Sequence, residues 1–105
     1  MTEFEWLACE EPDLLLEHVE GTVRREALVE FVRRCWERVK PHLPPVQSDV
    51  TVVDQYAALA PGQSDHDAVL YAAEAALKAA GWSPDIKAEQ RQQAALLRQI
   101  VGHPF

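Results

Sequence analysis

The chain has 105 residues, of which 48% are hydrophobic and 26% charged, and its net charge is −7. This length predicts one domain, spanning residues 1–105, with enough apolar content for a core. The negative charge argues against nucleic-acid binding, which needs clustered cations. No apolar stretch approaches the length that a membrane-spanning helix needs, so we expect no membrane association.

The first residues predict two short helices. Thr2 followed three residues later by Glu5 forms a capping box, so a helix should begin at once. Pro12 suits the first turn of a second helix, and Asp13 lies near the positive end of that helix's dipole. Gly21 then ends it.

The region from Thr22 to Val39 predicts a long amphipathic helix. Its apolar residues recur at the spacing of one helix face, with Arg and Glu on the other; they are Val23, Ala27, Leu28, Phe31, Val32, Cys35, Trp36 and Val39. We expect Thr22 to cap this helix and Pro41 to stop it. The preceding residues 1–21 hold acids but no Lys or Arg, so we expect the two segments to lie close and to offset each other's charge.

The second half of the chain predicts three more helices. The run Val50–Val53 is β-branched and could form a strand, but a helix beginning at Ser48 is preferred because no second strand is available to pair with it. An alanine-rich helix should follow a cap at Ser64 or Asp65 and end at Gly81. Residues 83–84 should open the last helix, which Gly102 ends.

Together these elements predict an all-α protein, a compact bundle of five to six helices. We expect Trp6, Trp36 and Trp82 to pack into its core. The cysteines lie in apolar helical patterns, and no signal-peptide pattern opens the chain, so we expect a reduced, cytoplasmic protein.

No motif predicts an enzyme, a metal site or a cofactor. Cys9 and His18, like Cys35 and His42, lack the spacing of zinc ligands. The sequence 65–67, Asp-His-Asp, reads as the start of a helix, where neighbouring side chains point in different directions. Burial on the apolar face should raise the pKa of the Cys35 thiol and leave it inert.

The two ends of the chain resemble a family of short hypothetical proteins from planctomycete-type bacteria. The resemblance is carried by the opening T-E-x-E-W-L-A-C, which begins at Thr2, and the closing L-L-R-x-I-x-G-x-P-F, which ends at Phe105. It implies a helical chain anchored by Trp6 and Phe105, with Gly102 as a helix stop, and it implies no activity. Where the family clusters cysteines around the position of Cys35, this chain has Arg and Trp.

The function that these features favour is a non-enzymatic interaction or regulatory module, which presents a helical surface to a protein partner or to a second copy. The predicted interaction surface joins a basic group and an acidic group: Arg25, Arg33 and Arg34 with Glu10, Glu11 and Asp13. The alternative is a small-molecule-binding protein or enzyme with a pocket between Trp36, Tyr56, Tyr71 and Trp82. A third reading, a nucleic-acid mimic, needs carboxylates spaced regularly on one surface.

Overall fold

The computed structural model describes residues 1–43, 62 and 64–102. These residues form α1 (Glu3–Ala8), α2 (Pro12–Val19), α3 (Arg25–Val39), the short 3-10 helix η1 (Lys40–His42), α5 (Asp65–Ala80) and α6 (Ile86–Val101). Within these ranges no residue adopts a strand, which confirms the expected all-α class. The predicted helix through Val50 lies outside the described residues.

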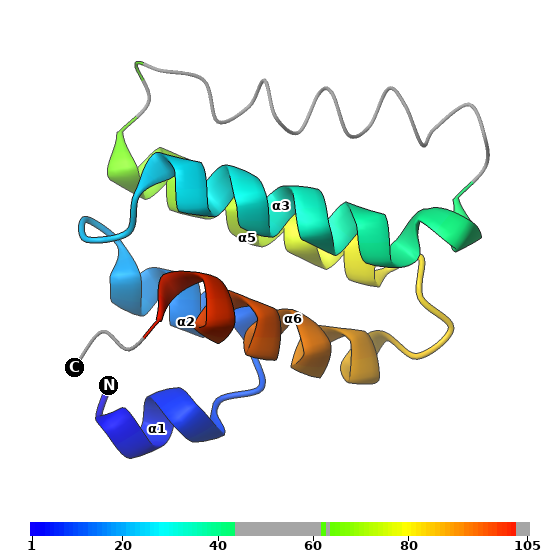
Figure 1. Ribbon diagram of the computed structural model, residues 1–105, viewed down its shortest axis with the longest axis horizontal. Coiled ribbons are helices and arrows are strands. Elements are labelled where there is room, and N and C mark those ends of the chain that lie inside the picture. Colours follow the sequence, from blue (N-terminus) through cyan, green and yellow to red (C-terminus); the bar gives the residue numbers. More distant parts are fainter. Residues whose placement is uncertain (44–61, 63, 103–105) are drawn as a thin grey trace.

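The four longer helices pack as one bundle around α5. Figure 1 shows α3 and α5 running in the same direction, with α2 and α6 running in the opposite direction. The helix α5 contacts each of the other three, and α6 also contacts α2 and α3. Small side chains allow this close approach, since α5 buries six alanines: Ala68, Ala72, Ala75, Ala76, Ala79 and Ala80.

The long amphipathic helix is confirmed, with a later start than expected. Its apolar face is buried at Leu28, Phe31, Val32, Cys35, Trp36 and Val39. The expected cap at Thr22 is wrong, because Arg24 precedes the first helical residue. The Thr22 hydroxyl instead donates to the carbonyl of Val19 (3.0 Å), and Gly21 adopts a φ of 85°, so both residues belong to the exit from α2.

The other helix ends mostly follow the sequence signals. The capping box at Thr2, proline in the first turn of α2 and glycine at the ends of α5 and α6 are all confirmed. Ser64 caps α5 by accepting from the Asp67 backbone N–H (3.1 Å). The last helix, however, begins at Ile86, because the Asp85 carboxylate caps it.

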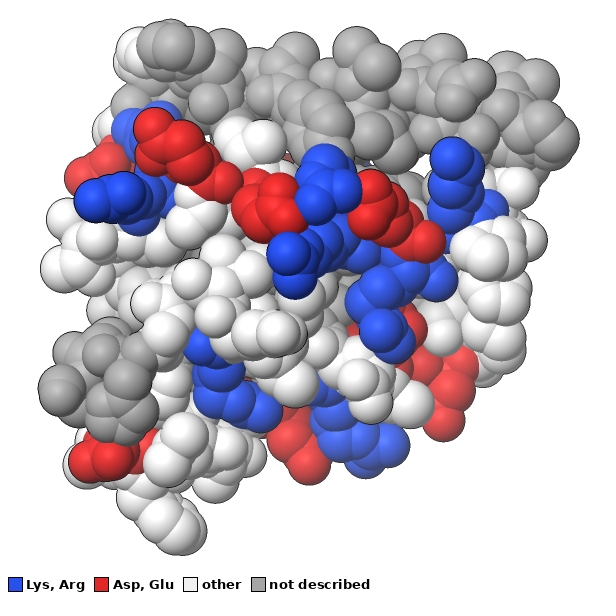
Figure 2. Space-filling view, viewed as in Figure 1, with Lys and Arg blue, Asp and Glu red and all other residues white. Residues whose placement is uncertain are grey.

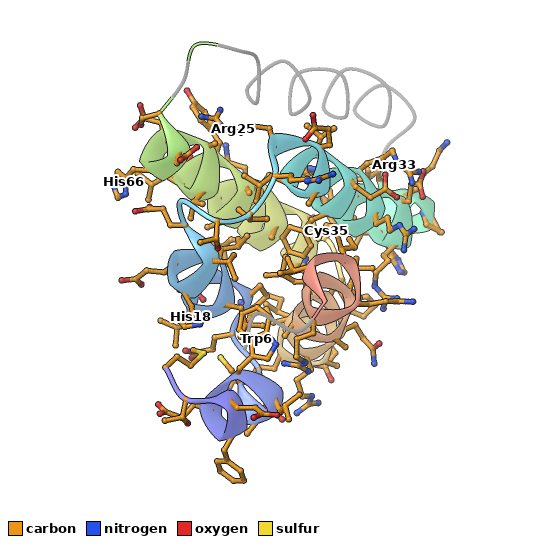
Figure 3. The ribbon with its side chains drawn as sticks, turned by 60° about the vertical axis from the view of Figure 1, so that its left-hand side comes forward. Trp6, His18, Arg25, Arg33, Cys35 and His66 are labelled. Carbon is orange, nitrogen blue, oxygen red and sulfur yellow. The ribbon has the colours of Figure 1, made fainter. Side chains whose placement is uncertain are left out.

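Two of the three tryptophans lie in the core. Trp6 and Trp36 are fully buried, and Figure 3 shows Trp6 pointing from α1 toward the longer helices. Arg98 of α6 holds α1 in place by donating to the backbone carbonyls of Trp6 (3.3 Å) and Cys9 (2.6 Å). The expectation for Trp82 is wrong: its side chain is 38% exposed, because it follows Gly81 in the turn beyond the packed part of α5.

Candidate functional site

The arginines of the predicted interaction surface have carboxylate partners within the fold. Arg25 donates to Asp65 of α5 (3.3 Å), and Arg34 donates to Glu30 one turn back (2.7 Å). Arg33 pairs with both Glu30 and Glu37. Figure 2 shows the basic and acidic side chains of this face interleaved along α3. The positive charge of α3 is therefore offset locally.

Two ion pairs of α3 shift the pKa of one of their members. Hydrogen bonds from Arg33 and Arg34 lower the pKa of Glu30 from 4.5 to about 2. Glu89 of α6, whose side chain is only 10% exposed, accepts two bonds from Arg38 (2.7 and 3.2 Å) and raises the pKa of that guanidinium. The described carboxylates that pair with the arginines of α3 thus lie on α3, α5 and α6. The sequence instead predicted that residues 1–21 would supply these carboxylates.

The acids of the predicted surface lie elsewhere. Glu10, Glu11 and Asp13 are exposed around the start of α2. Glu11 and Asp13 line a groove of about 670 Å³ that α2, α5 and α6 form together, and Glu10 does not line it. The groove thus includes two of the three acids of the predicted surface and none of its arginines.

The groove has an apolar floor and an acidic rim. The floor comes mainly from α5, through Val69, Leu70, Ala73, Ala76 and Leu77. The rim follows one face of α2, since Asp13, Glu17 and Glu20 recur at the spacing of successive helical turns. On α5, Leu70, Glu74 and Leu77 share the same spacing. Leu70 and Leu77 remain 47% and 59% exposed, so the floor is open to a ligand.

Within the described part of the chain, most of the rim carboxylates have no cationic partner. Among the described residues, no Lys, Arg or His pairs with Glu11, Asp13, Glu17 or Glu74. The exception is Glu20, which contacts His66 Nδ1 at 2.7 Å and joins the end of α2 to the start of α5. Figure 3 shows His66 on the outer side of α5, at that end. As far as residues 1–43, 62 and 64–102 are concerned, the rim therefore presents uncompensated negative charge.

Two polar side chains, Gln90 and Gln93, line this groove from α6, and Gln93 is the buried one of the two. Gln93 is 1% exposed, and its Nε2 donates to the carbonyl of Ala76 (2.8 Å). Its Oε1 is buried and finds no hydrogen-bond donor among the described residues. Leaving such an acceptor unpaired costs about 1–3 kcal/mol, and its burial places it out of reach of solvent.

The residues considered for chemistry remain apart. Burial raises the pKa of the Cys35 thiol, as expected, and Cys9 and Cys35 are both free thiols. Asp65 and His66 point to different partners, Arg25 and Glu20. Across the described ranges no three His, Cys, Asp or Glu residues gather as metal ligands.

The aromatic pocket of the alternative reading does not coincide with the groove. Trp36 is buried in the core, Tyr71 and Trp82 are exposed, and none of the three lines the groove. Tyr56 lies outside the described residues.

In the part of the chain that the structure covers, no helix is both long and apolar enough to cross a bilayer.

Sequence reasoning missed most of the groove. The spacing of Asp13, Glu17 and Glu20 is visible in the sequence and could have marked one face of α2 as acidic. Nothing local identifies Leu70, Leu77 or Gln93, because their meeting depends on how three helices pack.

Comparison with protein-family models, curated proteins and solved structures gives no match for this chain. The resemblance stated for its two ends therefore stays a prediction. Function has to be argued from the groove itself.

Proposed function

We propose that the protein is a non-enzymatic interaction module, and that its groove receives a positively charged segment of a partner protein. The observation that carries this proposal is an open apolar floor beside carboxylates that no cation of the described chain offsets. The proposal keeps Glu11 and Asp13 from the surface predicted on the sequence. It leaves out Arg25, Arg33 and Arg34, because their charges already have partners.

The charge of the groove selects among partners. Nucleic acid and anionic membranes would be repelled by the rim. A second copy would bring another net charge of −7 toward the same carboxylates, which disfavours self-association at this site. A nucleic-acid mimic would present its charge without the exposed leucines at positions 70 and 77. A cationic protein segment with apolar side chains satisfies both features.

We also infer a cytoplasmic location. The support is the pair of free thiols, which is typical of proteins in a reducing compartment.

The test measures the affinity of a synthetic helix built from leucine and lysine, labelled with fluorescein and followed by fluorescence anisotropy. The groove variant combines Glu17→Gln with Glu74→Gln, one carboxylate from each side of the groove. We expect the variant to bind about fivefold more weakly at low salt, and this difference to shrink as salt is added.

The matched control combines Glu10→Gln with Glu26→Gln, which removes the same charge from exposed positions outside the groove. This control should bind like the native chain. Equal weakening by both variants would show that the peptide responds to net charge alone and would overturn the proposal.

A further inference from the structure

The groove places exposed leucines of α5 beside a row of carboxylates on α2. Leu70 and Leu77 are separated by two helical turns, about 10 Å at the rise of an α-helix. Asp13 and Glu20 on α2 have the same separation, and Glu17 lies between them. The two helices are in contact and run in opposite directions (Figure 1). An apolar row and an acidic row therefore lie side by side, and both have the period of a helix.

The lining of the groove favours a helical ligand over an extended one. Its described walls come from α2, α5 and α6, so no strand edge among them can pair with the backbone of an extended segment. Such a segment would place its backbone carbonyls against leucines and beside carboxylates, which only accept hydrogen bonds. A helix pairs its own carbonyls, so that its side chains alone face the groove.

The length of the groove sets the length of that helix. The side formed by α5 extends from His66 to Leu77, which corresponds to about 16 Å at the rise of an α-helix. A ligand helix of about 11 residues, or three turns, spans that distance. Apolar residues three, four and seven positions apart form one face of such a helix and would cover Leu70 and Leu77.

The carboxylates of the groove are divided unevenly between its sides. Four come from α2 and the residue before it: Glu11, Asp13, Glu17 and Glu20. Among the described residues, α5 contributes one carboxylate, that of Glu74, and α6 contributes only uncharged side chains. A ligand helix therefore gains most from cations on the flank that faces α2, and less from cations on its other flank.

We propose that the groove recognises an amphipathic helix of about three turns whose cationic residues line one flank of its apolar face. The apolar face docks on Leu70 and Leu77, and the cationic flank lies along α2. This inference rests on the proposed function, since it assigns a partner class to the same groove. It adds a secondary structure and a placement of charge that a merely cationic segment does not need.

The test uses three synthetic peptides of about 15 residues, long enough to fold when bound. All have the same composition of leucine, lysine and alanine, and hence the same charge. The one-flank peptide places its lysines along one side of the leucine face. The far-side peptide places them opposite the leucines. The broken-helix peptide has the one-flank sequence with two D-residues, which disrupt the helix.

Affinities are measured by fluorescence anisotropy of the labelled peptides at low salt. We expect the one-flank peptide to bind the native chain about fivefold more tightly than the far-side peptide, whose lysines lie farther from α2. It should bind about tenfold more tightly than the broken-helix peptide. Equal affinity of the one-flank and broken-helix peptides overturns the helical ligand, and equal affinity of the one-flank and far-side peptides overturns the cationic flank.

A variant of the floor tests where the peptide docks. Leu70→Gln with Leu77→Gln removes apolar surface without changing charge, and both side chains are half exposed. This variant should bind the one-flank peptide about tenfold more weakly than the native chain. The matched control is Phe4→Gln with Leu7→Gln, which removes exposed apolar side chains outside the groove. The control should bind like the native chain, and equal weakening by both variants overturns docking on the floor.

Helical content and the unfolding midpoint establish that the floor variant folds. If it does not fold, the three peptides on the native chain decide by themselves.

The remaining outcomes separate this inference from the proposed function. Equal binding of all three peptides, with weakening by Glu17→Gln and Glu74→Gln retained, overturns the helical partner and leaves the interaction module standing. Peptides that do not bind at all overturn both. Spermine that displaces the one-flank peptide at equal concentration also overturns the helical partner, because spermine offers charge without an apolar face.

Discussion

The outer face of α3 and the groove beside α2 are both highly charged, yet they differ in how that charge is compensated. The arginines along α3 form ion pairs with carboxylates on α3, α5 and α6. At the groove, carboxylates from two helices stand together, and only Glu20 has a partner among the described residues, His66. Charge that is paired inside the fold supports the fold, and charge left unpaired beside exposed leucines is available to another molecule.

The largest expected effect comes from breaking the ion pair between Arg38 of α3 and Glu89 of α6. Arg38→Ala leaves the nearly buried carboxylate of Glu89 without its guanidinium. We expect this change to lower the free energy of unfolding by about 2 kcal/mol, measured by urea denaturation.

The control for this change replaces both partners, Arg38→Met with Glu89→Met, which removes the charges together. The double variant should lose less stability than Arg38→Ala. A loss below about 0.5 kcal/mol for Arg38→Ala would mean that the pair behaves like an ordinary surface pair.

Removing a carboxylate from the groove should not lower the free energy of unfolding, in contrast to breaking the Arg38–Glu89 pair. Glu17 follows Asp13 by four residues and precedes Glu20 by three, so like charges face one another along α2. Glu17→Gln should therefore leave the free energy of unfolding unchanged or raise it by about 0.5 kcal/mol at low salt. Urea denaturation of the native chain and the variant measures this. A loss of about 1 kcal/mol or more would show that this carboxylate stabilises the fold, and the contrast between the two faces would fail.

The smallest effect concerns the pH dependence of the pairs on α3. The pKa of Glu30 falls from 4.5 to about 2 in the folded chain. A carboxyl group whose folded pKa is lowered stabilises the fold above its unfolded pKa and loses that contribution as the pH falls. The difference in thermal midpoint between the native chain and Glu30→Gln should thus be constant above pH 4.5 and vanish as the pH drops toward 2. A difference that grows in acid would contradict the pairing.

The parts of the fold that sequence predicted well depend on local chemistry. The apolar face from Leu28 to Val39 follows from helical spacing, and the cap at Thr2 follows from one side chain's reach to a nearby N–H. Where more than one residue could start a helix, the prediction from sequence was wrong. Asp85 caps α6 although Ser83 and Pro84 looked like the start of that helix.

The candidate site was harder to predict, because it depends on packing between distant elements. The sequence shows that Arg33 and Glu30 lie one turn apart, but it does not show that Arg38 reaches Glu89 on another helix. Helical spacing groups Gln93 with Leu97 and Ile100 on the last helix, but it does not show that its side chain meets Ala76 of α5. Acidic residues in α2 could be recognised as a group, whereas their role depends on the leucines that α5 places beside them.

The most direct measurement is an NMR titration of the isotope-labelled native chain with the basic amphipathic peptide. If the groove is the binding site, amide shifts will concentrate on α2 and α5, around Glu17, Leu70 and Leu77, and those around Arg33 and Arg34 will stay unchanged. Shifts that instead follow the outer face of α3, with α2 unaffected, would contradict the account.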